Sequence, residues 1–394
     1  MATSSGSYAL LGTRPKREGG VVRKLREAGA ILLGKTNLSE FCNLRGNVSN
    51  WGWSPRGGQS EGAYFPKMSP SGSSSGSAVA TDLALGFASI GSEVGALTMT
   101  GHDLNIMLQT IGSMISPAES NNIAAIKPTA GLVSQDGVIP VSRKHDSLGP
   151  MARTIKDAAA ILTVIAGKDL HDPRTARIPF SHVPDYTESC TATDLNSVRI
   201  GVPWNTMADV PSAIMETFKT ALAQLQSLGA TIVDTKYTGA DQHAALSNKE
   251  KLTSQLINFR QSMDDFLQEL DRNPNEICSV EDLSNAVMRD PREDYPHRDI
   301  ELWKWAIDLD EDADAAKLAS ERDTYFAGEG GILGALERSN LDALVFPTAA
   351  KMSDHFAAGG GLPVITVPLG YLPNDTEVKW SPRHDLVTQS PNRP

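Results

Sequence analysis

The stretch that decides the fold of this chain is "SPSGSSSGSAVATDLALGFASIGS", residues 69–92. Its first nine residues, 69–77, are all Gly or Ser except Pro70, a composition typical of flexible linkers. It then runs without a break into apolar residues that predict a buried helix followed by a short strand. A linker does not normally open directly onto a buried helix. We therefore interpret the Gly/Ser residues as a rigid turn at a helix N-terminus, where backbone amides and hydroxyls can take part in chemistry.

Patterns on either side of this stretch predict alternating helices and strands. A helix over 19–28 ends in a tight turn at Gly29, and a short apolar strand, Ala30 to Leu33, follows it. The segment 154–167 predicts an amphipathic helix with Thr154 as its N-cap and Gly167 at its end. Strands at 198–205 and 230–235 flank a helix at 211–229, a βαβ pattern that implies parallel pairing. Two more strands are expected within 341–348 and 362–370.

These elements favour one large α/β domain with a mixed β-sheet covered by helices. Residues 241–340 are charged and helical in pattern, and we expect them to form a helical cap or an insertion within the domain. The chain has 394 residues, of which 40% are hydrophobic and 21% charged, so it is ordinary globular material with enough length to bury a sizeable core.

Charge and composition exclude several classes of protein. The net charge of -11 argues against a surface for nucleic acid or an anionic membrane, because phosphate neutralisation needs clustered Lys and Arg. The sequence shows neither a secretory signal nor an apolar run long enough to span a membrane, so we expect a cytoplasmic protein. No cofactor is implied, and no HExxH motif or paired Cys/His cluster predicts a metal site. The three cysteines are widely spaced, which fits a reduced compartment: Cys42, Cys190 and Cys278.

Three other motifs have simpler interpretations. "GAILLGKT", Gly29 to Thr36, matches the phosphate-binding loop pattern, but a helix precedes it and strand-like residues lie where backbone amides should hold phosphate. "DEDADAAKLASE", Asp310 to Glu321, resembles a calcium loop, yet it has Ala315 where that loop needs Gly, so a solvated helix is the better interpretation. His145-Asp146 could belong to a Ser-His-Asp triad, which only geometry would establish.

Several long motifs, in the same order, resemble the amidase signature family in its fungal form. They are "GSYALLG" (6–12), "VVRKLREAGAILLGKTNLSEF" (21–41), "GWSPRGGQSEGAYFP" (52–66), "SPSGSSSGSAVA" (69–80) and "SPAESNNIAAIKPTAGLVSQDGVIPVSRKHDSLGPMARTIKDAAAIL" (116–162). The similarity is dense up to Gly167, looser through the helical middle, and resumes at "GLPVITVPLGYLPNDTEVKWSPR" (361–383). It identifies 1–167 as a signature core that holds both active serines of the family.

The resemblance implies an amide (C–N) hydrolase acting on a small-molecule amide through a Ser-Ser-Lys triad. By motif position the nucleophile falls on Ser113, and the second serine, which passes the proton, falls on Ser73. The resemblance further implies that the Gly72–Ser73 peptide bond is cis and that the Ser73 hydroxyl reaches Ser113. A neutral lysine would serve as the base, since a serine hydroxyl is weakly nucleophilic until a base takes its proton. The backbone amides ahead of the nucleophile, those of Thr110, Ile111 and Gly112, would form the oxyanion hole.

The sequence departs from the family in three ways. The family lysine lies well upstream of the cis serine, and Lys16, Lys24 and Lys35 do not match its motif. Ser73 and Ser113 are 40 positions apart, about 16 more than the roughly two dozen usual in the family, an excess beyond ordinary loop variation. The extra residues, 95–110, suggest a retained intron or a true insertion. The C-terminus stops where family members continue into a further strand and helix.

We therefore expect 1–394 to be an incomplete amidase signature domain whose activity as written is doubtful. Two alternatives remain, a non-catalytic relative or defective gene product, and an amidotransferase subunit that hands ammonia to a synthetase. The sequence leaves the substrate and the oligomeric state open, because fold alone does not fix function.

Overall fold

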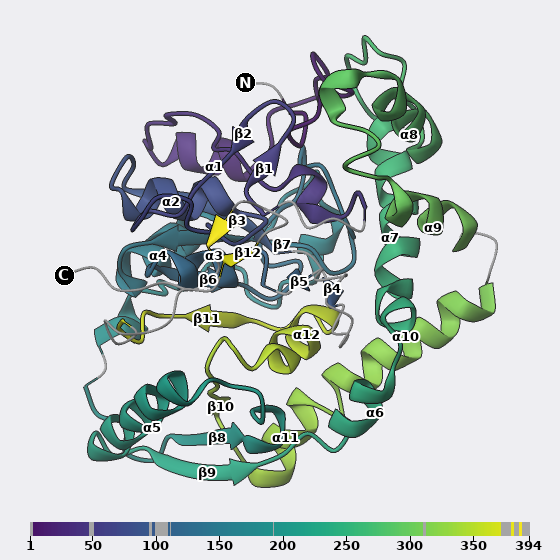
Figure 1. Cartoon of the computed structure of the whole chain (residues 1–394). Coiled ribbons are helices and arrows are strands. Elements are labelled where there is room, and N and C mark those ends of the chain that lie inside the picture. The colour runs from purple at the N-terminus through teal and green to yellow at the C-terminus, as the bar shows by residue number, and fades with distance from the viewer. Residues whose placement is uncertain are drawn as a thin grey trace.

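The computed structural model describes residues 3–46, 51–93, 112–191, 193–309 and 313–371, with the backbones of 97–98, 109–110, 380–381 and 386–387. Its described strands form two main sheets, which lie in the upper and lower parts of Figure 1. The upper sheet is antiparallel, with the strand order β11 (Val364–Thr366), β6 (Ala124–Lys127), β7 (Ser147–Ala152) and β3 (Ala88–Glu93). The lower sheet is parallel, with the order β10 (Ala343–Leu344), β8 (Arg199–Pro203) and β9 (Thr231–Thr235).

Three short hairpins complete the described strands. They are β1 (Trp53–Ser54) with β2 (Gly58–Gln59), β4 (Leu97–Thr98) with β5 (Gln109–Thr110), and β12 (Trp380–Ser381) with β13 (Leu386–Val387). The β4–β5 hairpin falls within the extra segment before Ser113, and β4 packs against the long helix α7 (Asn248–Gln268). Part of the extra segment therefore leads toward the helical side of the molecule.

Helices cover both sheets, as Figure 1 shows. The first five along the chain are α1 (Gly20–Glu27), α2 (Ser75–Asp82), α3 (Ile115–Ser120), α4 (Ile155–Ile165) and α5 (Ser212–Ser227). The later ones, besides α7, are α6 (Ala240–Ala245), α8 (Val280–Arg289), α9 (Glu301–Leu309), α10 (Ala313–Ala327), α11 (Ile332–Ser339) and α12 (Lys351–Gly359). Short 3-10 turns lie at Glu40–Asn43, Pro173–Arg177, Glu188–Thr191, Trp204–Thr206 and Pro291–Glu293.

Most of the local predictions are confirmed. Strands β8 and β9 pair in parallel around α5, as the βαβ pattern predicts. Helix α4 begins after Thr154, whose hydroxyl accepts a hydrogen bond from the Asp157 amide at 3.1 Å, the N-cap contact that satisfies an amide at the start of a helix. Helix α10 begins at Ala313, so that part of the calcium-loop motif is helical rather than a loop. The predicted α/β class with helices covering sheets is confirmed, with parallel and antiparallel pairing in separate described sheets.

The predicted strand from Ala30 to Leu33 is wrong. Residues 30–38 have no regular secondary structure, and the side chains of Ile31 and Leu33 are 87% and 75% exposed. Apolar residues favour a strand only where a neighbouring strand supplies hydrogen bonds and a surface to pack on. Within the described parts of the chain no strand pairs with this segment.

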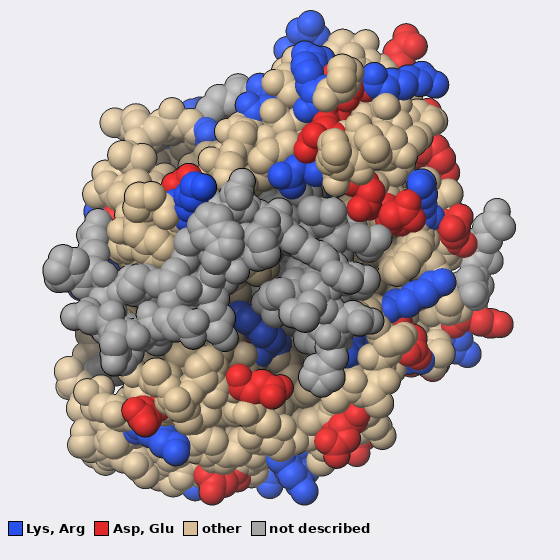
Figure 2. Space-filling view, in the orientation of Figure 1, with Lys and Arg blue, Asp and Glu red and all other residues tan. Residues whose placement is uncertain are grey.

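The core is divided among several clusters, and two of them position the site. A large one joins α7, α8 and α9 to the N-terminal loop through Leu10, Phe41, Phe259 and Trp303. A smaller one joins α2, α3 and the antiparallel sheet through Ala78, Met114, Ala118 and Met151. The face in Figure 2 mixes acidic and basic side chains. Within the described residues, no helix combines the length and the apolar character that crossing a bilayer requires.

Candidate active site

The Gly/Ser stretch forms a rigid turn fastened to strand β3. The Ser74 hydroxyl accepts a hydrogen bond from the Ser92 amide at 3.1 Å, and the Ser77 hydroxyl donates to the Ile90 carbonyl at 3.0 Å. The Ser89 hydroxyl in turn donates to the Ser77 carbonyl at 2.8 Å. These contacts run between α2 and β3, so the hydroxyls replace the apolar packing that a helix usually makes on a strand. The segment is part of the core and not a linker.

Ser73 occupies the turn that precedes α2. The Gly72–Ser73 peptide bond is cis, which confirms the prediction for this bond. Ser73 is 1% exposed, and its carbonyl accepts a hydrogen bond from the Ser39 amide at 3.0 Å. The Cys42 thiol lies beside it, and burial raises the pKa of that thiol to about 12, with hydrogen bonds to Ser73 and Ser92 opposing the shift. Cys42 is therefore a neutral thiol at physiological pH.

Ser113 lies directly before α3, in a turn that only glycine suits. Gly112 has φ +81°, and a Cβ there would come within 2.9 Å of the Ser116 hydroxyl. Ser113 is completely buried, and its Oγ has no hydrogen-bond partner within the described residues. Its carbonyl accepts a hydrogen bond from the Ser74 amide at 2.8 Å. The structure thus joins the loops of Ser73 and Ser113, which are far apart in the sequence. The predicted hydrogen bond between the Ser73 hydroxyl and Ser113 is wrong for this structure, because the backbones of the two loops are joined while Ser113 Oγ has no partner within the described residues.

Glu93, at the end of β3, fixes the turn that carries Ser113. Its two carboxylate oxygens accept hydrogen bonds from the Ser113 amide at 2.6 Å and from the Met114 amide at 2.8 Å. Glu93 is 1% exposed, and burial raises its pKa, while the amides and the charge of Lys127 oppose that shift. A carboxylate that accepts backbone amides at the start of a helix also complements the partial positive charge of that end. Sequence reasoning missed this residue.

Lys127 is the second residue that sequence reasoning missed. It lies at the end of β6, is 1% exposed, and donates a hydrogen bond to the Leu362 carbonyl at 2.6 Å. Burial lowers its pKa to about 8, and the negative charge of Glu93 works in the opposite direction. A charged residue in the otherwise buried strand Ala124–Lys127 was the available signal for it. The charges of Lys127 and Glu93 therefore interact within the buried core, and Glu93 in turn holds the Ser113 turn.

The other lysines near the N-terminus are engaged elsewhere. Lys24 donates hydrogen bonds to the carbonyls of Ile165, Ala166 and Gly167 at the end of α4. Lys35 contacts the Thr3 hydroxyl at 2.9 Å. Neither contact involves Ser73 or Ser113.

The His145-Asp146 pair does not form a triad. Asp146 Oδ2 accepts hydrogen bonds from the amides of Val141 and Ser142 at 2.8 and 2.9 Å, while His145 Nδ1 lies 3.3 Å from the Ser142 hydroxyl. The carboxylate thus holds a backbone turn instead of orienting the imidazole ring. Burial raises the pKa of Asp146 to about 7.

Of the three predicted oxyanion residues, Ile111 lies outside the described residues. Thr110 is in β5, opposite Leu97 of β4, and Gly112 provides the turn into Ser113. Over the described part of the chain, no group of three or more His, Cys, Asp or Glu side chains is arranged to hold a metal ion.

Comparison with known proteins places this arrangement in a family. The family model described as "Amidase" matches residues 1–360. A putative amidase of Arthroderma benhamiae is 39% identical over 399 residues, which include the whole of this chain and 64% of the relative. The chain thus spans less than two thirds of that relative's length.

A solved structure and a more distant relative agree with that match. The native peptide amidase of Stenotrophomonas maltophilia has a TM-score of 0.80 and 36% identity, over 94% of this chain and 74% of that one. A glutamyl-tRNA(Gln) amidotransferase subunit of Trichodesmium erythraeum is 35% identical over 233 residues, 58% of this chain and 43% of the relative. With its two serine loops joined beside a buried carboxylate, and with a family match that covers most of its length, this chain belongs to the amidase family.

Proposed function

We propose that this protein is an amide hydrolase in which Ser113 is the nucleophile and Ser73 passes its proton. The proposal rests on the environment of the Ser113 side chain. Its hydroxyl is fully buried and has no partner in the described residues, yet its backbone is held by Glu93 and by Ser74. A buried hydroxyl without a partner is costly, and such groups in native structures usually have a chemical role.

In the proposed reaction the Ser113 oxygen attacks the amide carbonyl carbon, and its proton moves through Ser73. The carbonyl oxygen becomes negatively charged and is stabilised by backbone amides, for which Thr110, Ile111 and Gly112 remain the proposed donors. Collapse of this intermediate breaks the C–N bond, and the leaving amine takes the proton. Water then hydrolyses the acyl–Ser113 ester, which releases the acid and restores the hydroxyl.

Glu93 constrains where the oxyanion can bind. Because its carboxylate already accepts the amides of Ser113 and Met114, those two amides are not free to stabilise a second negative charge. The donors must therefore come from the residues that precede Ser113. The extra segment 95–110 leads directly into them, so we expect the 394-residue chain to be a slow catalyst.

The match over the whole chain favours an amidase over an amidotransferase subunit, since the amidotransferase relative matches only 58% of the chain. The 36% identity to a peptide amidase makes peptide amides the first candidate substrates. A non-catalytic relative would keep the same fold, and only an activity measurement separates it from an enzyme.

The test is hydrolysis of an aryl amide and of a peptide amide by purified protein, compared with its Ser113→Ala variant. Ser120→Ala, at the end of the same helix α3, is the matched control. We expect Ser113→Ala to abolish hydrolysis while the far-UV circular dichroism stays unchanged, and Ser120→Ala to retain full activity. Equal rates for the native chain and Ser113→Ala would remove Ser113 from the proposed role.

A further inference from the structure

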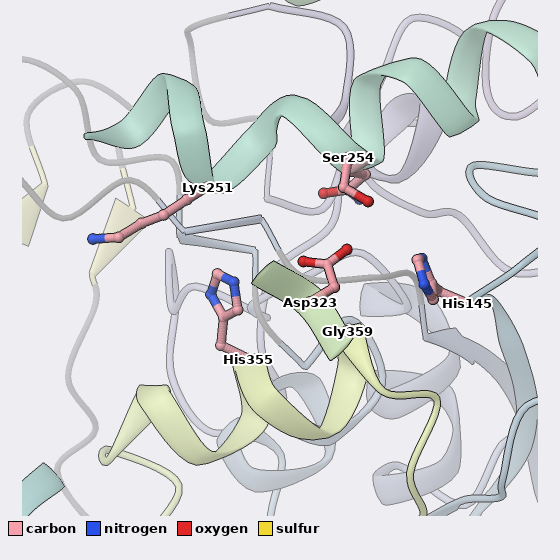
Figure 3. A pocket seen from close by; sticks show the side chains of 7 residues that line it. His145, Lys251, Ser254, Asp323, His355 and Gly359 are labelled. Atoms are coloured by element: carbon pink, nitrogen blue, oxygen red, sulfur yellow. The ribbon is translucent and has the colours of Figure 1, made fainter. Parts of the chain in front are cut away.

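Helix α12 approaches the Ser113 turn from a different part of the molecule. It packs on α10 and α11, and the ring of its Phe356 stacks on Phe326 of α10 with 5.3 Å between the ring centroids. Its His355 points into a small polar pocket shared with α7, as Figure 3 shows. These contacts fix α12 within the helical layer, and they fix the backbone of its first residue, Lys351, with it.

The side chain of Lys351 reaches from α12 to α3. Its ammonium group donates a hydrogen bond to Ser116 Oγ at 3.2 Å, although the two residues are 235 positions apart in the sequence. Lys351 is half-buried, and Ser116 is buried. Because a hydrogen bond from a charged donor is stronger than one between neutral groups, this contact holds the Ser116 hydroxyl in one orientation.

Ser116 in turn contacts the residue that precedes the proposed nucleophile. Its amide donates a hydrogen bond to the Gly112 carbonyl at 2.7 Å. A Cβ on Gly112 would lie 2.9 Å from Ser116 Oγ, so the hydroxyl lies directly against this glycine. Gly112 has φ +81° and no side chain of its own to stabilise that conformation. The Ser116 hydroxyl therefore limits how far the Gly112 backbone can move.

Acidic side chains on both helices favour this position of the ammonium group. Asp354, one turn further along α12, is buried; burial raises its pKa to about 7, and the charge of Lys351 opposes that rise. The ammonium group also interacts electrostatically with Glu119 of α3. Lys351 is thus attracted toward the junction of the two helices, where Ser116 lies.

We propose that Lys351 is a positioning residue for the oxyanion site. Through the Ser116 hydroxyl it holds Gly112, one of the proposed amide donors, in the conformation that the reaction needs. This role rests on the proposed function, because only acyl transfer at Ser113 requires an oxyanion site. Loss of Lys351 should lower kcat and leave KM nearly unchanged, since the oxyanion forms only after the substrate has bound.

The first experiment compares the kinetics of Lys351→Met, Ser116→Ala and the double variant on an aryl amide. We expect each single variant to lower kcat by about tenfold and to change KM by less than about twofold, because a small displacement of a catalytic group is costly. The double variant should be no slower than either single variant, since both changes remove the same contact. Lys351→Arg keeps a charged donor and should retain most of the activity. Lys317→Met, at an exposed position of α10, is the matched control and should equal the native chain.

The second experiment measures hydrogen exchange by mass spectrometry in overlapping peptides that span residues 112–120, and needs no turnover. The Ser116 amide is protected by its bond to the Gly112 carbonyl. We expect Lys351→Met to speed exchange of this amide by at least about tenfold, because a looser turn opens more often. Lys317→Met should leave the exchange unchanged. If circular dichroism shows that Lys351→Met folds poorly, Lys351→Gln removes the charge with a polar side chain, and the same changes are expected.

The two experiments separate this inference from the proposed function. Faster exchange in a chain that hydrolyses no amide would support the hold of Lys351 on Gly112 and overturn the hydrolase. Unchanged exchange and unchanged kcat in Lys351→Met would overturn the inference and leave the hydrolase intact. Faster exchange with an unchanged kcat would also overturn it, since the contact would then serve stability alone. So would a double variant whose loss is the product of the two single losses, because the two residues would then act independently.

Discussion

Replacement of Glu93 by Gln tests whether this carboxylate holds the nucleophile in place. The carboxylate accepts two backbone amides, at 2.6 and 2.8 Å, in a site that is almost completely buried. The glutamine side chain has one acceptor, and its NH₂ group would face a second donor. One amide hydrogen bond would be weakened by about 1 kcal/mol, and the other amide would be left unpaired at about 1–3 kcal/mol.

The expected loss is therefore about 2–4 kcal/mol in the free energy of unfolding, before any effect on Lys127. The assay is urea unfolding at pH 7, followed by circular dichroism. Glu216→Gln, the same substitution on an exposed position of α5, is the control and should change stability by less than about 0.5 kcal/mol. If Ser113 is the nucleophile, its displacement should also lower kcat by about 10²-fold.

The reasoning would be refuted by a Glu93→Gln protein that unfolds within about 0.5 kcal/mol of the native chain. Such a result would mean that the two amides find other partners, and that Glu93 does not fix the turn. A stable variant that had nevertheless lost activity would separate the catalytic role of Glu93 from its structural one.

Three further predictions concern buried charges. Lys127→Met should lower the free energy of unfolding in urea by about 1–3 kcal/mol, because it leaves the Leu362 carbonyl without its donor and removes a charge that opposes the rise in the pKa of Glu93; an unchanged midpoint would show that neither interaction contributes. Neither carboxyl oxygen of Asp354 has a hydrogen-bond partner in the described residues, and burial raises the pKa of this carboxyl to about 7. The folded state therefore favours the protonated carboxyl. The stability that this preference contributes is fully present below about pH 4 and is lost as the pH rises through 7. Asp354→Asn should therefore be close to neutral at pH 4 and stabilising at pH 8, by roughly 4 kcal/mol at most, and equal effects at both pH values would contradict the assignment. Burial lowers the pKa of His243 to about 4, so the folded state favours the neutral ring. The stability that the neutral ring contributes is present above pH 6.5 and is lost as the pH falls through 4. His243→Phe should therefore flatten the decline in melting temperature over that range, and an unaltered decline would contradict this role of His243.

The sequence by itself determined the family and the local structure. The βαβ unit around α5, the Thr154 cap of α4 and the helix that follows the Gly/Ser turn depend on neighbours within a few residues, and periodicity and capping patterns report such contacts directly. The positions of Ser73 and Ser113, and the cis bond before Ser73, came from motif resemblance. The roles of these two serines remain predictions.

Only the tertiary structure decided what surrounds the serines. Glu93 and Lys127 belong to separate strands, and nothing in the local pattern of either shows that the folded chain buries both and lets their charges interact. Ala30 to Leu33 are apolar but do not form the predicted strand, because an apolar segment becomes a strand only when a neighbouring strand pairs with it. Burial, pairing and pKa depend on contacts between residues far apart in the sequence, and only folding establishes those contacts.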